Sequence, residues 1–84
     1  MNYRIKIRRS AQKSLARIPL QYQRPIIRAI EALSREPRPK GCKKLVGRDA
    51  WRLRIGNYRV IYEIEDRDSI IVVVIIGHRK TVYE

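Results

Sequence analysis

Alternation of apolar and polar side chains dominates the first residues of the chain. Residues 3–8 read Tyr-Arg-Ile-Lys-Ile-Arg, a period of two that predicts a strand with one buried face. Apolar residues then recur at helical spacing in two segments. The first is a short helix that Ser10 caps and Pro19 ends. The second covers residues 24–35, where Pro25 is tolerated because it stands in the first turn. The first half therefore predicts one strand followed by two helices.

The second half of the chain reads as a sheet. Gly56-Asn57 is a two-residue hairpin signal between two stretches rich in large apolar residues. Every residue from Ile70 to Ile76 is apolar, as expected for a central strand covered on both faces. The strand candidates are residues 43–46, 51–55, 58–64 and 69–76. We expect a single α+β domain over residues 1–84. It would combine a twisted, mainly antiparallel sheet of about four to five strands with two N-terminal helices packed on one face.

The hairpin places three arginines on one face of this sheet. If Gly56-Asn57 is the loop, Arg54 pairs with Arg59 and Arg52 pairs with Ile61. Like charges directly opposite each other destabilise a sheet by a few tenths to about 1 kcal/mol per pair. Stability alone therefore does not explain the cluster. Two interpretations stay open: a phosphate-binding surface, because guanidinium forks match phosphate oxygens, or solvated side chains that splay apart.

The register of the last strand decides whether a fourth arginine joins this face. That register depends on the turn that follows Glu65. With Glu65 opposite Ser69, Arg59 faces Ile75. Arg79 then continues the face that carries Arg59. A change of one residue in the turn would reverse this assignment, so the prediction is conditional.

The charge of the chain points to a polyanionic partner. The formal net charge is +12, from 20 Lys and Arg against eight Asp and Glu. A surface this basic attracts nucleic acid through counterion release. Improved solubility and attraction to a membrane surface are the alternatives, but no long amphipathic membrane helix is visible and we expect no membrane partner. A single cysteine and a single histidine exclude a structural zinc cluster. With no signal-peptide pattern, a cytoplasmic location is expected.

An arginine face without metal ligands suits metal-independent RNA cleavage. The sequence offers no paired carboxylates, Gly-rich phosphate loop or metal cluster, so we expect no metal and no cofactor. In such cleavage the ribose 2′-OH attacks the adjacent phosphate, while the protein positions the RNA, neutralises charge and moves protons. Arginine is too basic to be an ordinary general base. The candidates for proton transfer are His78, Tyr83, Lys80, Lys43 and Lys44. The sequence leaves the base open.

Two of these candidate groups need separate comment. His78 points away from the arginines unless the last strand ends after Gly77. It is either an acid–base participant or a solvated side chain at a strand end. Cys42 lies in a loop rich in Pro and Gly, far in sequence from the histidine, and is a poor candidate for a nucleophile.

Two sequence blocks, together with the predicted order of strands and helices, resemble those of a known family. Residues 56–62 read Gly-Asn-Tyr-Arg-Val-Ile-Tyr, and residues 77–83 read Gly-His-Arg-Lys-Thr-Val-Tyr. Over essentially the whole chain they resemble the RelE branch of the RelE/ParE toxin superfamily. The resemblance implies a RelE-like fold and a toxin of a type II toxin–antitoxin system. It further implies an endoribonuclease that cleaves messenger RNA in the ribosomal A site and so inhibits translation.

The resemblance also implies roles for individual residues. Arg52 and Arg54 would assist proton transfer and charge stabilisation, although well-studied members carry lysines there. Arg59 and Arg79 would bind and stabilise the scissile phosphate, and Tyr83 would stack on the RNA or help to activate it. His78 joins this catalytic set as the acid–base candidate, and the expected RNA-binding residues are Lys43, Lys44, Arg48 and Lys80.

The resemblance implies partners and leaves two other functions open. The expected partners are a cognate antitoxin that wraps the toxin with an extended segment, messenger RNA with the ribosome, and operator DNA reached only through the antitoxin complex. A ParE-like poison of DNA gyrase would share the fold, and a noncatalytic nucleic-acid-binding protein would share the charge. ParE-type chains tend to end the last strand with two arginines and to lack the closing tyrosine. The arrangement Gly77-His78-Arg79 with Tyr83 therefore favours the ribonuclease.

Overall fold

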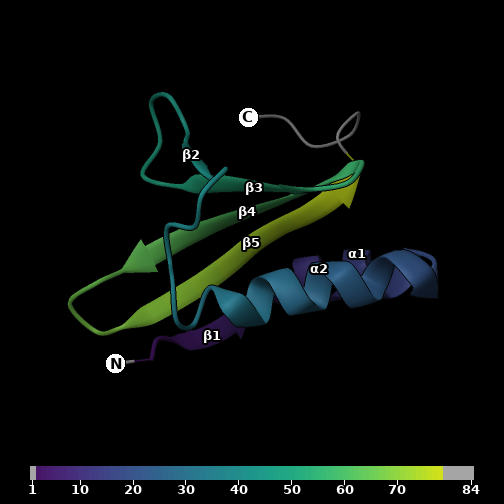
Figure 1. Ribbon diagram of the computed structural model, residues 1–84, viewed down its shortest axis with the longest axis horizontal. Coiled ribbons are helices and arrows are strands. Elements are labelled where there is room, and N and C mark those ends of the chain that lie inside the picture. Colours follow the sequence, from purple (N-terminus) through teal and green to yellow (C-terminus); the bar gives the residue numbers. More distant parts are fainter. Residues whose placement is uncertain (1, 79–84) are drawn as a thin grey trace.

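The computed structural model describes residues 2–78 and has two layers, a twisted sheet and a pair of helices (Figure 1). The helices are α1 (Arg9–Arg17) and α2 (Leu20–Ala32). The strands are β1 (Arg4–Ile7), β2 (Lys43–Lys44), β3 (Trp51–Ile55), β4 (Tyr58–Glu65) and β5 (Ile70–His78). None of the helices in the described range is long and apolar enough to cross a membrane.

The five strands form one mixed sheet in the order β1-β5-β4-β3-β2. β1 pairs with β5 in parallel, and the other three pairs are antiparallel. β5 lies between β1 and β4, and its apolar side chains are buried or half-buried on both faces, in the helix-side core and in a smaller cluster on the other side, as predicted for a central strand. The predicted α+β fold with two helices on a mainly antiparallel sheet is confirmed.

The helix starts differ from the prediction in two respects. Ser10 is not a cap, since α1 begins one residue earlier and its N-cap is Arg8, with no side-chain cap bond. Helix α2 begins at Leu20, directly after Pro19, so Pro25 lies inside the helix rather than in its first turn. A proline at this position has no N–H to donate to the carbonyl group four residues earlier. Tertiary packing of the apolar face of the helix outweighs that loss.

The helices cover one face of the sheet and bury the main core between the layers. Tyr62, Val60 and Val73 are fully buried strand residues in this cluster, and Ile26 and Leu33 are fully buried residues that come from α2 and its end. The strand residues of this cluster face the helices because successive residues of a strand point to opposite faces, so only every second position of β4 contributes to it. The helix-covered face is therefore the stabilising side of the sheet.

The other face, which we call the open face, is partly covered by its own small cluster. The loop between β2 and β3 folds back so that Leu45 and Ala50 pack with Ile61 and Val74. The backbone N–H of Leu45 donates to the carbonyl of Ala50 at 2.9 Å and closes this loop. The apolar cluster excludes water from one part of the open face and leaves the rest to polar side chains.

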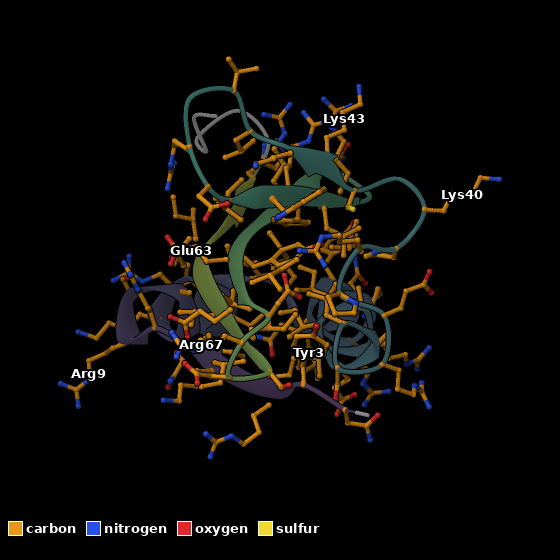
Figure 2. The ribbon with its side chains drawn as sticks, turned by 90° about the vertical axis from the view of Figure 1, so that its left-hand side faces the viewer. Tyr3, Arg9, Lys40, Lys43, Glu63 and Arg67 are labelled. Atoms are coloured by element: carbon orange, nitrogen blue, oxygen red, sulfur yellow. The ribbon has the colours of Figure 1, made fainter. Side chains whose placement is uncertain are left out.

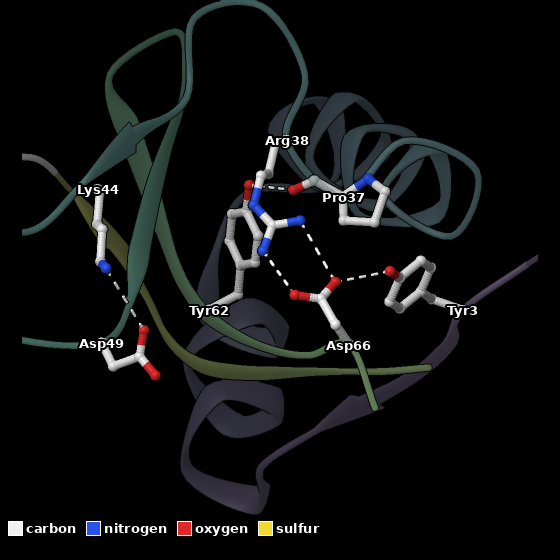
Figure 3. A network of polar contacts seen from close by, with 7 residues as sticks. All are labelled: Tyr3, Pro37, Arg38, Lys44, Asp49, Tyr62 and Asp66. Atoms are coloured by element: carbon white, nitrogen blue, oxygen red, sulfur yellow. Dashed lines mark hydrogen bonds and ion pairs between the residues drawn. The ribbon is translucent and has the colours of Figure 1, made fainter. Parts of the chain in front are cut away.

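A polar network ties three distant segments together at the end of the sheet away from the β3–β4 hairpin (Figure 3). The Arg38 guanidinium donates to both carboxylate oxygens of Asp66, at 2.8 and 3.3 Å, and the Tyr3 hydroxyl donates to the same group at 2.7 Å. These hydrogen bonds hold the pKa of Asp66 below its usual value. Arg38 also lies 5.2 Å from the ring centroid of Trp51. The network therefore fixes the loop that leads into β2.

Candidate active site

The β3–β4 hairpin brings three arginines together on the open face. Gly56 has φ +60°, a left-handed conformation that suits the two-residue loop Gly56-Asn57. Arg54 is directly opposite Arg59, and Arg52 is opposite Ile61, as the sequence predicts. Because residues 52, 54 and 59 share one face, we call this group the arginine face.

The three guanidinium-bearing residues differ in how firmly the fold holds them. Arg52 is buried, with 8% of its surface exposed, although it carries a charge. It lies between Ile61 on β4 and Lys43 on β2, its partners in register. Arg59 is half-buried and Arg54 is exposed. Packing along the stem of Arg52 and Arg59 orients two of the three groups before any ligand binds.

Charge is distributed unevenly along the open face. Across β5, Lys6 and Glu63 both pair with Val72, so a base and an acid flank the same strand position. Figure 2 shows Lys43 at the top of the view, beside the strands β2 and β3, and Glu63 and Arg67 lower on the left. Glu63 lies four residues along β4 from Arg59, about 13 Å at 3.3 Å per residue. The hairpin end of this face therefore concentrates positive charge, while the other end is balanced.

The predicted register of the last strand is wrong in detail. Glu65 pairs with Ile70 rather than with Ser69, because Ser69 remains in the turn with φ +54°. A bulge between Ile61 and Tyr62 shifts the pairing by one further residue, so Arg59 faces Gly77 and not residue 75. The turn and the bulge each shift the pairing by one residue, and together these two shifts return the residue opposite Arg59 to the predicted face of β5. Position 77 therefore lies on the arginine side of the sheet, as alternation from residue 75 requires.

The structure places His78 on the other side of the sheet from the arginines. β5 continues through His78, which pairs with Tyr58 on the helix-covered face. The two rings meet edge to face with centroids 5.6 Å apart. Since strand side chains alternate, His78 points away from Arg59, so the structure does not bring it together with the arginines, and its acid–base role stays a prediction.

The remaining predicted residues fall into three groups. Lys43 shares the open face with Arg52 through their pairing, and joins the arginine face. Lys44 is opposite Trp51, and its Nζ lies 3.8 Å from Oδ1 of Asp49 (Figure 3), so it is not on the face that carries Arg52. Arg48 is exposed in the loop between β2 and β3. Arg79, Lys80 and Tyr83 lie outside the described residues. Among residues 2–78, no group of three or more His, Cys, Asp or Glu side chains is placed to hold a metal ion.

Sequence reasoning did not find an aromatic cluster on the helix-covered side of the hairpin. Tyr22 from α2 and Tyr58 from β4 have ring centroids 5.7 Å apart with an interplanar angle of 43°. They line a cavity of about 410 Å³ together with Pro25, Asn57 and His78. The sequence pattern predicts that the second helix starts at residue 24, which leaves Tyr22 outside it. Pro19 is the sequence signal for an earlier helix start, and a helix that begins directly after it includes Tyr22 in its first turn, where Tyr22 contacts Tyr58 of the hairpin.

Comparison with known proteins gives a consistent result over the whole chain. Residues 5–83 match the family model described as ParE toxin of the type II toxin–antitoxin system parDE. The archaeal RelE–RelB complex from Pyrococcus horikoshii OT3 contains a chain 32% identical to this one, with a TM-score of 0.86. The match covers 98% of this chain and 100% of that one. No match was found among curated proteins.

Two further solved structures share the fold. The toxin–antitoxin complex RelBE2 from Mycobacterium tuberculosis contains a chain that is 26% identical, with a TM-score of 0.83 and coverage of 94% of this chain and 100% of that one. A mutant of the E. coli toxin RelE in the free state is 19% identical, with a TM-score of 0.80 and coverage of 95% and 86%. At that identity the E. coli protein supports the fold alone.

Proposed function

The chain belongs to the ParE toxin family of type II toxin–antitoxin systems, within the RelE/ParE superfamily, and we propose that it is an endoribonuclease that cleaves messenger RNA on the ribosome. The family membership confirms the resemblance predicted from the sequence. The observation that carries the proposal is the grouping of Arg52, Arg54 and Arg59 on the open face at the hairpin end of the sheet. A phosphodiester is the anion that this arrangement fits best.

The proposed reaction needs no metal. The ribose O2′ attacks the adjacent phosphorus, a bond from O2′ to phosphorus forms, and the bond from phosphorus to O5′ breaks. A base takes the 2′-OH proton, and the leaving 5′ oxygen receives a proton, so the products are a 2′,3′-cyclic phosphate and a 5′-OH. Negative charge rises on the nonbridging oxygens in the transition state, where guanidinium donors stabilise it. Removal of one such donor costs about 10²- to 10³-fold in rate in comparable sites.

The unequal burial of the arginines supports a division of roles. Arg59 is half-buried and directly opposite Arg54, so a phosphate bound between them would replace a repulsion with two attractive contacts. Arg52, held beneath the surface next to Lys43, adds fixed positive charge to the same end of the face. The roles proposed for Arg79 in phosphate binding and for Tyr83 on the RNA rest on the family resemblance.

Proton transfer is assigned to groups other than His78. His78 lies across the sheet from the arginine face, in contact with Tyr58. Among residues 2–78, Lys43 carries a side-chain amine on the open face directly opposite Arg52. We therefore propose Tyr83, on the resemblance, and Lys43, on its position, as the groups that exchange protons with the RNA.

A cognate antitoxin is the expected protein partner. The solved structures from Pyrococcus horikoshii and Mycobacterium tuberculosis are complexes of a toxin with its antitoxin. A net charge of +12 favours an antitoxin with an acidic binding segment, because opposite charges speed and orient association. We propose further that operator DNA is bound only through this complex and that the toxin acts in the cytoplasm.

The test is to express the protein under tight control and to map the 5′ ends of messages bound to ribosomes. We expect arrested translation and new 5′-OH ends inside translated regions within minutes of induction. Arg59→Ala should remove the cuts while the purified variant keeps wild-type circular dichroism. Lys40→Ala is the matched control. This substitution lowers the net charge by the same amount, and Lys40 extends into solvent away from the sheet (Figure 2). Unchanged cutting by Arg59→Ala would remove the proposed site.

A second candidate function has one observation in its favour. The family model that matches residues 5–83 is described by the name of the ParE toxin, and the ParE branch acts on DNA gyrase. Under this alternative, induction produces gyrase-linked breaks in DNA and leaves messages intact. Purified protein would inhibit supercoiling by gyrase and would not cut ribosome-bound RNA. The two outcomes exclude each other, so one induction experiment with both readouts decides between them.

A further inference from the structure

An aromatic recess lies on the helix-covered side of the β3–β4 hairpin, opposite the arginine face. We call it the aromatic notch, defined by Tyr22, Pro25, Asn57, Tyr58 and His78. The rings of the two tyrosines are inclined at 43°, so they form a wedge rather than a closed stack. Tyr22 remains 46% exposed although its ring contacts that of Tyr58, so part of its aromatic face is open to a ligand.

A second cavity of equal size lies beside the notch. That cavity also measures about 410 Å³ and shares Tyr58 and His78 with the notch. Arg17, the last residue of α1, stands on its wall. None of the described residues that line either cavity is acidic. The two cavities therefore adjoin at Tyr58 and His78 and together offer aromatic faces and a cation, a combination that suits a single-stranded nucleic acid.

The notch and the arginine face are placed back to back at the same end of the sheet. Tyr58 and Arg59 are consecutive on β4, and Arg54 and Ile55 are consecutive on β3. Consecutive strand residues point to opposite faces, so the hairpin carries phosphate-binding groups on one side and stacking groups on the other. A flexible strand of RNA that crosses the hairpin end can reach both.

From this placement we propose that the aromatic notch binds a nucleobase of the RNA whose phosphate lies on the arginine face. The inference rests on the proposed ribonuclease function and names an additional contact with the same substrate. The base stacks on Tyr22 in the wedge next to Tyr58, while the side-chain amide of Asn57 offers a donor and an acceptor to the edge of the base. Arg17 holds a neighbouring phosphate.

The experiment measures binding of RNA that cannot be cut. A fluorescent 2′-O-methyl oligonucleotide of about ten nucleotides is compared with an abasic backbone of equal length by anisotropy, because only the former can stack. We expect wild type to prefer the base-containing strand by about 10-fold. Tyr22→Ala should remove most of that preference and leave abasic binding unchanged, whereas Tyr22→Phe should bind as wild type. Leu20→Ala, an exposed side chain of the same helix, is the matched control.

The possible outcomes separate this inference from the function on which it rests. If Tyr22→Ala retains the preference for bases, or if wild type has none, the notch is not a base site. If the preference disappears as expected but ribosome-bound messages stay intact, the notch stands and the nuclease assignment fails. If Tyr22→Ala weakens binding of the antitoxin and leaves RNA binding unchanged, the notch is a protein-binding surface and the proposal is overturned.

Discussion

The pairing of Arg54 with Arg59 predicts that one substitution should strengthen the fold and weaken the function. The two residues are directly opposite each other in the hairpin. Because the pair next to the two-residue loop is hydrogen-bonded, this next pair is of the non-hydrogen-bonded kind, whose side chains lie closest together. Arg54 is the more exposed of the two, so Arg54→Gln removes a charge with little loss of packing.

The size of the effect follows from electrostatics. With two guanidinium groups about 7 Å apart, Coulomb repulsion is about 0.6 kcal/mol in a dielectric of about 80 and rises where the surface excludes water. Measured values for like charges opposite each other span a few tenths to about 1 kcal/mol. At about 0.01 M salt the Debye length is about 30 Å and most of the repulsion persists, whereas at about 1 M it is about 3 Å and little remains.

Urea unfolding is the suitable assay because urea, unlike guanidinium chloride, adds no salt. For a domain of 84 residues a slope of about 1 kcal/mol per molar urea converts the expected gain into a midpoint shift of roughly 0.6 M. Arg54→Gln should show this upward shift at low salt and lose it in 1 M NaCl. RNA cleavage by the same variant should fall by about 10²-fold, because a donor to the developing charge is gone.

Two controls isolate the cause. Arg54→Lys keeps the charge and should leave the midpoint near wild type. Lys40→Gln lowers the net charge equally without a partner across a strand, and should shift the midpoint much less. If Arg54→Gln gains nothing at low salt, or if its gain persists in 1 M NaCl, repulsion within the arginine face is not what limits stability and the reasoning is refuted.

Three further predictions concern the fold around the site. Tyr62→Phe removes a hydroxyl that donates to the Pro37 carbonyl at 2.8 Å inside the core, and should cost about 1 kcal/mol or about 4–8 °C in Tm by calorimetry; an unchanged Tm would contradict it. Since the Arg38 guanidinium lowers the pKa of Asp66, wild type should lose stability relative to Asp66→Asn as the pH falls below about 4; parallel curves of urea midpoint against pH would disprove the link. Ile71→Ala, at a fully buried position near the start of β5, should cost about 2–5 kcal/mol in urea unfolding, and a loss below about 1 kcal/mol would place it outside the core.

The fold was predictable because the alternation along the strands is strong and local. The Gly56-Asn57 loop fixes its own register, and all the hairpin pairs follow from it. The turn after Glu65 has no such signal, because Ser69 takes a left-handed backbone conformation that its residue type does not predict. The bulge at Ile61/Tyr62 likewise depends on how the long strands twist against the helices. The sequence specified what local chemistry controls and missed what packing controls.

The candidate site divides in the same way. The clustering of Arg52, Arg54 and Arg59 is a consequence of one hairpin, so it is visible in the sequence. The burial of Arg52 and the recess beside Tyr22 require the β2–β3 loop and α2 to be packed against that hairpin, which no local pattern encodes. Contacts between segments far apart in sequence are therefore the part of the site that the sequence pattern does not predict.

Alternation also separates stability from function along the hairpin strands. On β4, Val60 and Tyr62 point into the core and are fully buried, whereas Arg59 and Glu63 point to the open face. Substitutions at the first kind of position should lower stability and leave the chemistry of folded molecules intact. Substitutions at the arginine positions should do the reverse, because the fold tolerates these charges at a small cost. A cluster of like charges on an ordered strand is therefore evidence of a ligand that neutralises it, and a polyanion is the ligand that fits.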